Sequence, residues 1–457
     1  MKMTRRALYL FDRLASKLVK PSEQPAMVAF IPTNNGVYIA SIGDNAAVSL
    51  FVLSKERITP FVVPLTLVKE LAVSKSNDDV NFDVTGNTVT VHWYQDAIPN
   101  HRRHTFSAVP KLPPLPSKTT SHSKLLLDAI TDASKVMDKD NARYALGAIS
   151  LNGETGQIAA TDGRQCLVQD GFKFAFQENA LLPVSKIFTS KEFREAGENI
   201  TLGFEKGLIY FSVGTVHLWY KSIAGAFPNI KRLFDEKAER TWIDLNDADA
   251  RFLAERLQHL PGNDDPCKPV FIAFNENGVS VRGYDKEHQS CTEVKLSRSR
   301  CKGTAGLIAI DRTFIKNALD FGIKTLGFDL NSKPMLGDGF NKSFIAMPLE
   351  TKEKPEYDRD KLNVVETSRT VSVPSKMERT VRDRVPVVVT TAARIVKPTT
   401  DTSDKPHHLL AEAECIRNAL KTSLVNVNSL ITEIKKHRRQ EHLMRTTIES
   451  FKKLQQI

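Results

Sequence analysis

Residues 180–190 read ALLPVSKIFTS, an apolar run that meets a proline and continues with apolar residues at helical spacing. The same junction occurs at residues 61–71, which read FVVPLTLVKEL. Proline is favoured in the first turn of a helix, because its missing N–H would have no intrahelical partner there. Each junction therefore predicts a strand that ends where a helix begins, and the two prolines, Pro64 and Pro183, stand 119 residues apart.

A third copy of the junction occurs at residues 307–319, LIAIDRTFIKNAL, where Asp311 replaces the proline and is a favoured N-cap. Three apolar runs that end in proline, TFSAVP, SIAGAFP and SFIAMP, recur at nearly the same spacing, with their prolines at Pro110, Pro228 and Pro348. A period of this length predicts three tandem copies of one structural unit.

Each unit begins with apolar residues that recur every three or four positions, which predicts an amphipathic helix. These helices are expected near residues 4–19, 122–137 and 246–260. Short alternating runs before and after each junction predict three or four strands apiece. The order helix, strands, helix, strands predicts an α+β fold with two helices on antiparallel sheets in each unit. We expect three domains, at residues 1–117, 118–236 and 237–350.

Five motifs follow one another in a fixed order along this repeat: ARYALGAIS (142–150), AATDGRQCL (159–167), LLPVSKIF (181–188), GAFPNIKRLF (225–234) and FIAMPLE (344–350). In this order and spacing they resemble the bacterial DNA sliding clamp, the beta subunit of the replicative DNA polymerase. The resemblance covers about residues 4–350. It implies three tandem DNA-clamp domains, a head-to-tail ring homodimer around double-stranded DNA, and a non-catalytic protein without a cofactor. Such a ring tethers DNA polymerase, the clamp loader and repair proteins, which raises their effective concentration at DNA.

The net charge of +11 points to a polyanionic partner. Residues 351–457 hold 21 Lys and Arg against 14 Asp and Glu, so the first 350 residues are only slightly basic, and DNA affinity there must come from local placement. Cations on the non-apolar faces of the helices suit sequence-independent phosphate contacts, although they are also the ordinary solvent face of an amphipathic helix. The DNA-facing candidates are Arg5, Arg6, Arg13, Lys17, Lys20, Lys124, Lys135, Lys186, Lys191, Arg194, Arg251, Arg256, Arg312 and Lys316.

The resemblance also implies an apolar pocket between the second and third domains, into which partner proteins insert a short peptide. Methionine suits such a pocket because its flexible side chain adapts to several ligands, although an apolar residue can equally belong to the core. After Thr-Asp-Gly the family pattern has His-Arg-Leu, whereas this chain has Arg-Gln-Cys, which changes the charge and volume of the pocket. The candidates are Leu146, Thr161, Gly163, Arg164, Gln165, Cys166, Pro228, Arg232, Leu233, Ile345, Met347, Pro348 and Leu349.

The family pattern stops about two residues after Met-Pro, but this chain continues. Residues 351–408 are polar and rich in charge and proline, which predicts a disordered linker, with VPVVV (385–389) as one short exception. From residue 409 to residue 457, apolar residues at heptad spacing predict a basic helical or coiled-coil tail. Its segment IKKHRRQEHLMR (434–445) can follow a nucleic-acid backbone, bind an acidic partner or form a solvated helix face. The linker is long enough to reach back to the pocket.

No phosphate-binding loop, metal-ligand spacing or nucleophile arrangement stands out, so we expect no enzyme, no cofactor and no metal. Five widely spread cysteines predict free thiols in a reducing cytoplasm. No run of 18 apolar residues occurs, so no membrane-spanning helix is expected.

Two hypotheses of function remain from the sequence. The first is a ring-forming clamp, whose subunit boundary is expected to use Phe106 and Leu260 as apolar contacts. The second is a clamp-derived, non-catalytic interaction module that has lost ring closure or use of the pocket and acts through its basic C-terminal tail. A monomer that is not retained on circular DNA would favour the second hypothesis.

Overall fold

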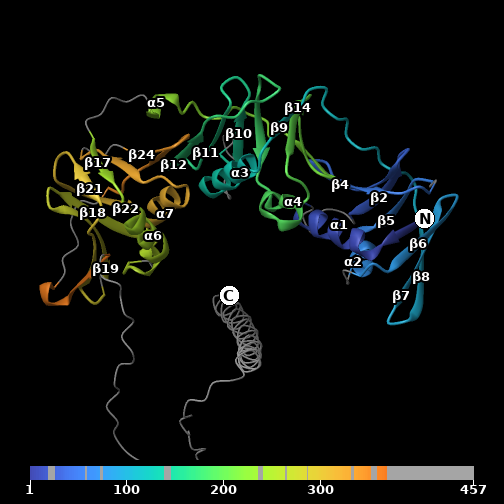
Figure 1. Cartoon of the computed structure of the whole chain (residues 1–457), viewed down its shortest axis with the longest axis horizontal. Coiled ribbons are helices and arrows are strands. Elements are labelled where there is room, and N and C mark those ends of the chain that lie inside the picture. The colour runs from blue at the N-terminus through green and yellow to red at the C-terminus, as the bar shows by residue number, and fades with distance from the viewer. Residues whose placement is uncertain are drawn as a thin grey trace, which may run out of the picture. The chain divides into compact units, whose positions relative to one another are not determined.

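The computed structural model describes residues 1–18, 26–56, 59–72, 76–137, 146–234, 240–262, 265–285, 287–330, 334–350 and 358–367. The chain divides into two compact units, Met1–Val373 and Pro374–Ile457, and every described residue belongs to the first (Figure 1). The predicted tail at 409–457 and the VPVVV segment lie outside the described residues.

The first repeat contains one four-stranded antiparallel sheet, ordered β1-β6-β7-β8, and four antiparallel strands, ordered β5-β2-β3-β4, that form half of an eight-stranded sheet. The predicted proline junction is confirmed, since Pro64 ends β5 and is the N-cap of α2. Its elements are β1 (Lys2–Thr4), α1 (Arg5–Leu18), β2 (Met27–Pro32), β3 (Gly36–Ile42), β4 (Ala46–Leu53), β5 (Phe61–Pro64), α2 (Leu65–Leu71), β6 (Asp79–Thr85), β7 (Thr88–Gln95) and β8 (Ile98–Thr105).

The second repeat has the same plan, with sheets ordered β13-β10-β11-β12 and β9-β14-β15-β16. The single helix predicted after Pro183 is instead two short pieces, because the Ser190 hydroxyl accepts a hydrogen bond from Phe193 N and starts a new helix. The elements are β9 (Thr120–His122), α3 (Leu125–Val136), β10 (Ala148–Asn152), β11 (Gln157–Thr161), β12 (Gln165–Gln169), β13 (Asn179–Pro183), η1 (Lys186–Thr189), α4 (Lys191–Arg194), β14 (Ile200–Glu205), β15 (Leu208–Val213) and β16 (Val216–Lys221).

The third repeat is built from strands ordered β22-β18-β19-β20 and β17-β23-β24-β25. The predicted N-cap is confirmed, because the Asp311 carboxylate accepts a hydrogen bond of 2.8 Å from Thr313 N. The elements are β17 (Thr241–Asp244), α6 (Asp247–Arg256), η2 (Leu257–His259), β18 (Pro269–Asn275), β19 (Gly278–Asp285), β20 (Ser290–Leu296), β21 (Arg300–Lys302), β22 (Gly306–Asp311), α7 (Arg312–Asp320), β23 (Thr325–Phe328), β24 (Met335–Gly339) and β25 (Lys342–Ala346), with α5 (Lys231–Phe234) between the second and third repeats.

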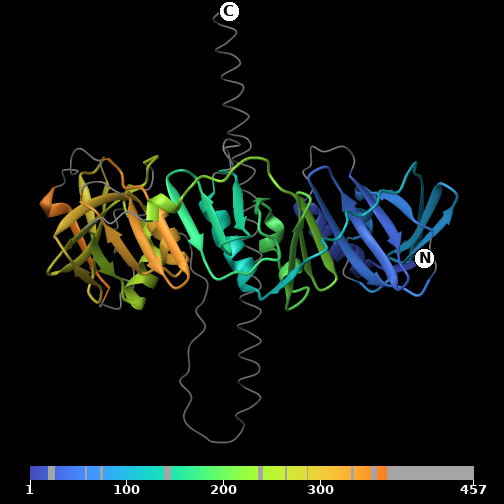
Figure 2. The same ribbon diagram turned by 90° about the horizontal axis from the view of Figure 1, so that it is seen from above.

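Sheets run on without interruption from one repeat to the next (Figure 2). At the first boundary β4 pairs with β16, from Val216–Leu50 to Tyr220–Ala46, and at the second β12 pairs with β25, from Gln165–Ala346 to Gln169–Lys342. Both pairings are antiparallel and contain five residue pairs. Each boundary therefore joins the last strand of a first half-repeat to the last strand of a second half-repeat.

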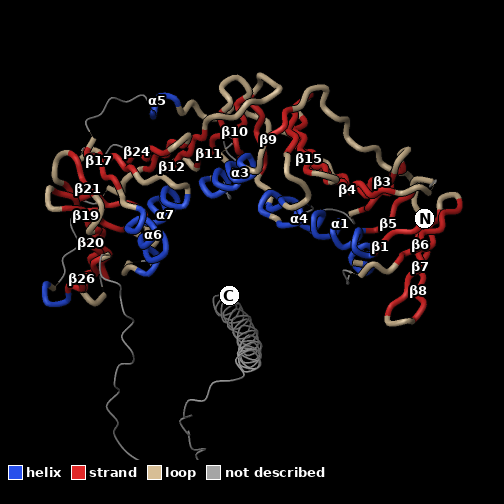
Figure 3. Tube along the Cα trace, in the orientation of Figure 1, coloured by secondary structure: helices blue, strands red, loops and turns tan. Residues whose placement is uncertain are grey.

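The helices α1, α3, α4, α6 and α7 lie on one side of these sheets (Figure 3). The apolar stripe predicted for the first helix is buried at Leu8, Phe11, Leu14 and Ala15, each 0% exposed. Complete burial of a leucine or phenylalanine side chain contributes about 1.5–3 kcal/mol, so this stripe fixes which face of α1 meets the sheets. No described helix is both long enough and apolar enough to cross a membrane.

One segment of the predicted linker is ordered. Beyond the third repeat, η3 (Arg359–Lys361) leads into β26 (Leu362–Glu366), which pairs in parallel with β20. The prediction of a disordered linker over 351–408 is therefore wrong for this segment. The short run LNVVE forms a strand because it pairs with the edge strand β20, about seventy residues earlier in the chain. No pattern within residues 351–408 predicts this pairing.

Candidate nucleic-acid interface and partner surface

Two arginines predicted to face DNA are buried instead, which corrects that expectation. Arg312 is 0% exposed and donates to five backbone carbonyls: its Nε to Lys268 (3.1 Å), its Nη1 to Leu257 (3.3 Å) and Leu260 (2.6 Å), and its Nη2 to Pro261 (2.6 Å) and Pro269 (3.1 Å). This guanidinium closes the C-terminal end of the α6–η2 helix, where carbonyls lack intrahelical partners and the helix dipole is negative.

Arg5 at the start of α1 is 6% exposed, and its Nη2 donates to the Tyr94 carbonyl at 2.6 Å. It therefore joins α1 to the end of β7 and offers little charge to solvent. Lys20 lies outside the described residues.

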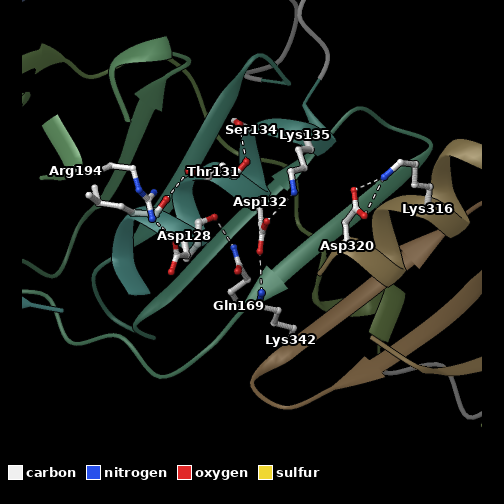
Figure 4. Close-up of polar contacts among 12 residues, drawn as sticks. Asp128, Thr131, Asp132, Ser134, Lys135, Gln169, Arg194, Lys316, Asp320 and Lys342 are labelled. Atoms are coloured by element: carbon white, nitrogen blue, oxygen red, sulfur yellow. Dashed lines mark hydrogen bonds and ion pairs between the residues drawn. The ribbon is translucent and has the colours of Figure 1, made fainter. Parts of the chain in front are cut away.

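Most of the other helix cations are paired with carboxylates on the same side of the molecule, and Figure 4 shows the pairs around α3. Such pairs hold the long side chains in place but reduce the positive potential available to phosphates. They are Arg13 and Lys17 with Glu192, Lys124 with Glu198, Lys135 with Asp132, Lys191 with Glu195, Arg194 with Asp128, and Lys316 with Asp320.

Four of the predicted cations are exposed and form no ion pair within the described part of the chain: Arg6, Lys186, Arg251 and Arg256. They come from α1, η1 and α6, so all three repeats contribute at least one. The helix side therefore carries a small number of available positive charges in every repeat. This arrangement favours loose contact with a polyanion over a tight, sequence-reading interface.

Glu192 on α4 joins the first two repeats on the helix side. It accepts from Lys17 Nζ at 2.9 Å and from Arg13 Nε at 3.2 Å, both on α1. These contacts, chiefly the hydrogen bond from Lys17, lower the pKa of Glu192 to about 2. The boundary is thus held by strand pairing on one side of the molecule and by an ion-pair group on the other.

The Thr-Asp-Gly turn is a hydrogen-bonded support for the second boundary. The Thr161 hydroxyl donates to the Gln165 carbonyl at 2.7 Å, and the Asp162 carboxylate accepts from the backbone N–H groups of Arg164 and Gln165 at 2.8 Å each. Gly163 takes the left-handed backbone that this turn requires, with φ of +87°. The turn therefore presents Arg164 and Gln165 to the third repeat.

Three contacts from this turn cross to the third repeat. Asn317 Nδ2 on α7 donates to Gln165 Oε1 at 3.0 Å, and Met347 N donates to the Arg164 carbonyl at 2.8 Å. The Arg164 guanidinium lies 5.5 Å from the centre of the Phe314 ring, a cation–π distance. The departure of Arg-Gln-Cys from the family pattern is thus matched by partners within the same chain.

An apolar layer covers the strands where β12 meets β25. Cys166 and Ile345 are register partners and form a buried cluster with Ala159 and Val168. Phe227, Ile230, Phe234 and Leu336 pack on this cluster and are only partly buried. Burial raises the pKa of the Cys166 thiol to about 12, so Cys166 acts here as an apolar group and not as a nucleophile.

The predicted pocket residues separate into groups. Thr161, Gln165, Cys166 and Ile345 are buried, whereas Leu233 is 44% exposed and Met347 is 42% exposed. Gly163, Arg164 and Arg232 are exposed, and Leu146, Pro228 and Pro348 are half-buried. Leu349 belongs to a different cluster, with Phe271, Tyr284, Cys291 and Ala309, and its N–H donates to the Ala309 carbonyl at 2.8 Å.

Sequence reasoning missed Phe227, Ile230 and Phe234, which form the outer part of the apolar layer. Their spacing of three and four residues in FPNIKRLF is a signal that could have identified them, because it places all three on one face of a turn-like segment. It also missed Lys342 on β25, which pairs with Asp132 at 2.8 Å (Figure 4).

The two residues expected at a subunit boundary differ in exposure. Phe106 follows β8, is half-buried and packs against the main core. Leu260 is 7% exposed and belongs to that core, so it offers little surface to a second chain, and this expectation is corrected. Within the described ranges, no three His, Cys, Asp or Glu residues are grouped as metal ligands.

No protein-family model matches the sequence, and no curated protein matches it. Solved structures do match. DNA polymerase III subunit beta from Pseudomonas aeruginosa shares 17% identity, with 77% of this chain and 100% of that chain covered and a TM-score of 0.64. The corresponding subunit from Thermotoga maritima shares 18% identity over 77% and 99% of the two chains (TM-score 0.61). The C. crescentus beta sliding clamp shares 14% over 77% and 99% (TM-score 0.65). The chain therefore has the three-repeat α+β fold of the bacterial DNA sliding clamps.

Proposed function

We propose that this protein is a DNA sliding clamp, a non-catalytic processivity factor that encircles duplex DNA as a ring of two chains. The observation that carries the proposal is the strand pairing at the two internal boundaries. In both, the last strand of a first half-repeat (β4 or β12) pairs antiparallel with the last strand of a second half-repeat (β16 or β25).

The same rule identifies the strands that would close a ring. The third repeat's counterpart of β4 and β12 is β20, and the first repeat's counterpart of β16 and β25 is β8. Strand β8 lies at the edge of its sheet. Two chains placed head to tail, with β8 of each against β20 of the other, therefore give six repeats joined by six similar boundaries.

The helix side supplies the DNA-facing surface in this proposal. Arg6, Lys186, Arg251 and Arg256 contact phosphates without reading sequence, which lets the ring slide. The pairing of most other cations with carboxylates keeps this contact weak. Retention on DNA then comes from the closed ring and not from affinity.

The apolar layer at the second boundary is the proposed partner site. Leu233 and Met347 are exposed and lie close in sequence to members of the layer, Phe234 and Ile345 respectively, so an apolar side chain of a bound peptide can be removed from water there. A DNA polymerase or repair protein held through such a peptide stays close to DNA for as long as the ring remains closed.

Retention on circular DNA tests the clamp proposal. The full chain is incubated with nicked circular plasmid, so that subunits can assemble around it, and complexes are isolated by gel filtration at high salt. We expect co-elution that is lost when the plasmid is linearised, because a closed ring slides off a free end. Equal retention on circular and linear DNA would overturn the proposal, and so would the absence of retention on either at a protein concentration at which the chain is a dimer.

The partner site has its own test. A fluorescent peptide selected from an array on the wild-type chain should lose at least about tenfold in affinity when Met347 is replaced by serine, since one well-buried apolar side chain is worth more than 1.4 kcal/mol. The matched control is Leu115→Ser. Leu115 is 62% exposed and lies in the loop between β8 and β9, which connects the first repeat to the second. Equal affinities for the two variants would place the site elsewhere.

One observation favours the second candidate, a clamp-derived interaction module without ring closure. The β20 edge, which ring closure requires, carries β26 of the same chain. A permanently occupied edge would give a monomer that is not retained on circular DNA, with the basic tail as the working part. The two candidates differ in whether β26 leaves.

A further inference from the structure

We propose that β26 is a built-in competitor for the ring-closing edge: it holds β20 in the single chain and must leave before β8 of a second copy can pair there. This inference rests on the proposed clamp function and adds regulation of closure by the chain's own C-terminal extension. The strand lies against β20 over five residue pairs, from Cys291–Leu362 to Lys295–Glu366, as many as each internal boundary contains.

The two pairings exclude each other for a simple geometric reason. An edge strand presents one row of unpaired N–H and C=O groups, and β19 already occupies the other side of β20. While β26 is in place, the β20 edge is satisfied and the outermost strand is β26 itself. A ring closed through β20 therefore needs β26 to be displaced.

Side chains of β26 pack against apolar residues on both faces of the sheet. Leu362 packs on the cluster that contains Cys291 and Phe271, and Val365, opposite Val294, packs against the main core. Glu366 lies opposite Lys295, an opposite-charge pair across the strands. The strand thus matches the edge in apolar contact as well as in charge.

A hydroxyl anchors the end of the strand. Thr367 Oγ1 donates to Asp249 Oδ1 at 2.5 Å and accepts from Ser297 N at 3.2 Å. The Asp249 side chain is 0% exposed, and its other oxygen accepts from the hydroxyl of Ser299 at 2.7 Å. The extension therefore supplies one hydrogen bond to a buried carboxylate of α6. This contact indicates that the extension binds specifically at the β20 edge.

Other features make the strand replaceable. It is short and parallel to β20, and parallel pairing is slightly weaker per residue than the antiparallel pairing that β8 would form. Val364 is 46% exposed, and Leu362 and Val365 are only half-buried. What favours β26 is that it belongs to the same chain, so its effective concentration at the edge is high. A second copy competes at high protein concentration or when DNA holds two chains together.

The first experiment weakens β26 in the full chain. Replacing Leu362 and Val365 together by glutamate removes the apolar contact on both faces, whereas the matched control, Val364→Glu, adds charge at an exposed position of the same strand. We expect the double variant to dimerise at a protein concentration at least about tenfold lower than the wild type, and Val364→Glu to match the wild type. Sedimentation over the micromolar range measures this difference, and the 409–457 tail is identical in all three chains.

The second experiment locks β26 in place. Leu362→Cys sets a thiol opposite the native Cys291, and adjacent strands lie about 4.8 Å apart, within the Cα separation that a disulfide spans. After oxidation by oxidised glutathione, we expect a monomer that is not retained on circular DNA, and reduction should restore dimer formation. The control is Val365→Cys, which lies opposite Val294 and cannot form this bridge.

The outcomes separate the two proposals. If the wild type, the double variant and the locked chain all dimerise equally and stay on circular plasmid, the clamp proposal stands and competition by β26 is refuted. If the double variant dimerises less readily than the wild type, β26 is part of the contact between chains and the inference is again refuted. If no variant dimerises or stays on circular DNA, ring closure itself fails and both proposals fall.

Discussion

Replacing Arg312 by methionine decides whether this residue supports the fold or touches DNA. Methionine keeps most of the side-chain volume but removes the guanidinium donors from five backbone carbonyls between Leu257 and Pro269. Of these, the Leu257 and Lys268 carbonyls keep a backbone N–H donor. A hydrogen bond from a charged group is worth about 1.5–3 kcal/mol, but burying a guanidinium costs several kcal/mol. We therefore expect a net loss of about 3–5 kcal/mol, the range found when a buried charged network is broken.

The assay uses the distribution of the three tryptophans, one in each repeat: Trp93 on β7, Trp219 on β16 and Trp242 on β17. In a background with Trp93→Phe and Trp219→Phe, urea unfolding followed by fluorescence reports the third repeat alone. With a slope of about 2 kcal/mol per molar urea, Arg312→Met should lower the midpoint by about 2 M. The control is Lys316→Met on the same helix, where a surface ion pair contributes about 1 kcal/mol or less.

Retention on circular plasmid, measured on the same variants, tests the alternative that Arg312 contacts DNA. If Arg312→Met leaves the Trp242 transition within about 1 kcal/mol of the parent and shortens retention on DNA, then Arg312 is a phosphate contact. The buried position assigned to it would then be wrong, together with the carbonyl contacts that close the α6–η2 helix.

Three further predictions concern charge and reactivity. Contacts with Lys17 and Arg13 lower the pKa of Glu192 from 4.5 to about 2, so the stability that they give is complete above about pH 4.5 and is lost as the pH falls toward 2. Glu192→Gln should therefore destabilise the folded protein at pH 7 but scarcely at pH 2, as measured by urea titrations at both pH values. Replacing Arg6 and Arg256 by glutamine should reduce the slope of log affinity against log salt for a fluorescent duplex by up to about 2, and the ion-paired Lys316→Gln should change it less. Alkylation with iodoacetamide at pH 8, read by peptide mass, should label the exposed Cys267 and spare Cys166, whose thiol is buried with its pKa raised to about 12.

The repeat was predictable from the sequence because residues close together in the chain determine where its helices begin. Pro64 and Asp311 start helices for reasons that act within a few residues, and both positions are as predicted. The second junction was predicted less well, since Ser190 competes as an N-cap only seven residues after Pro183 and divides the helix. Local signals of equal strength thus limit where an element ends, even when its existence is certain.

The charged residues show a different limit. Arg5 and Arg312 carry the same sign as the exposed cations, but each stands three residues before a buried apolar residue, Leu8 or Ile315. Helical spacing therefore places both on the buried face, a signal that counting charges ignores. The partners that make burial possible are backbone carbonyls from other elements, and these only the folded chain brings together.

The position of β26 could not be predicted from local sequence, because it depends on which strands the three repeats leave without a partner from another repeat. Three repeats provide three strands of the β4 type and three of the β16 type; two of each are consumed within the chain, and β20 and β8 remain. Residue 362 follows the end of β25 by only 16 residues, so the extension reaches the β20 edge within its own repeat. A second chain must come from solution to reach the same edge. Any chain of this kind that carries an extended segment soon after its last repeat therefore meets its own open edge first, and ring closure becomes dependent on concentration and on whatever draws the segment away.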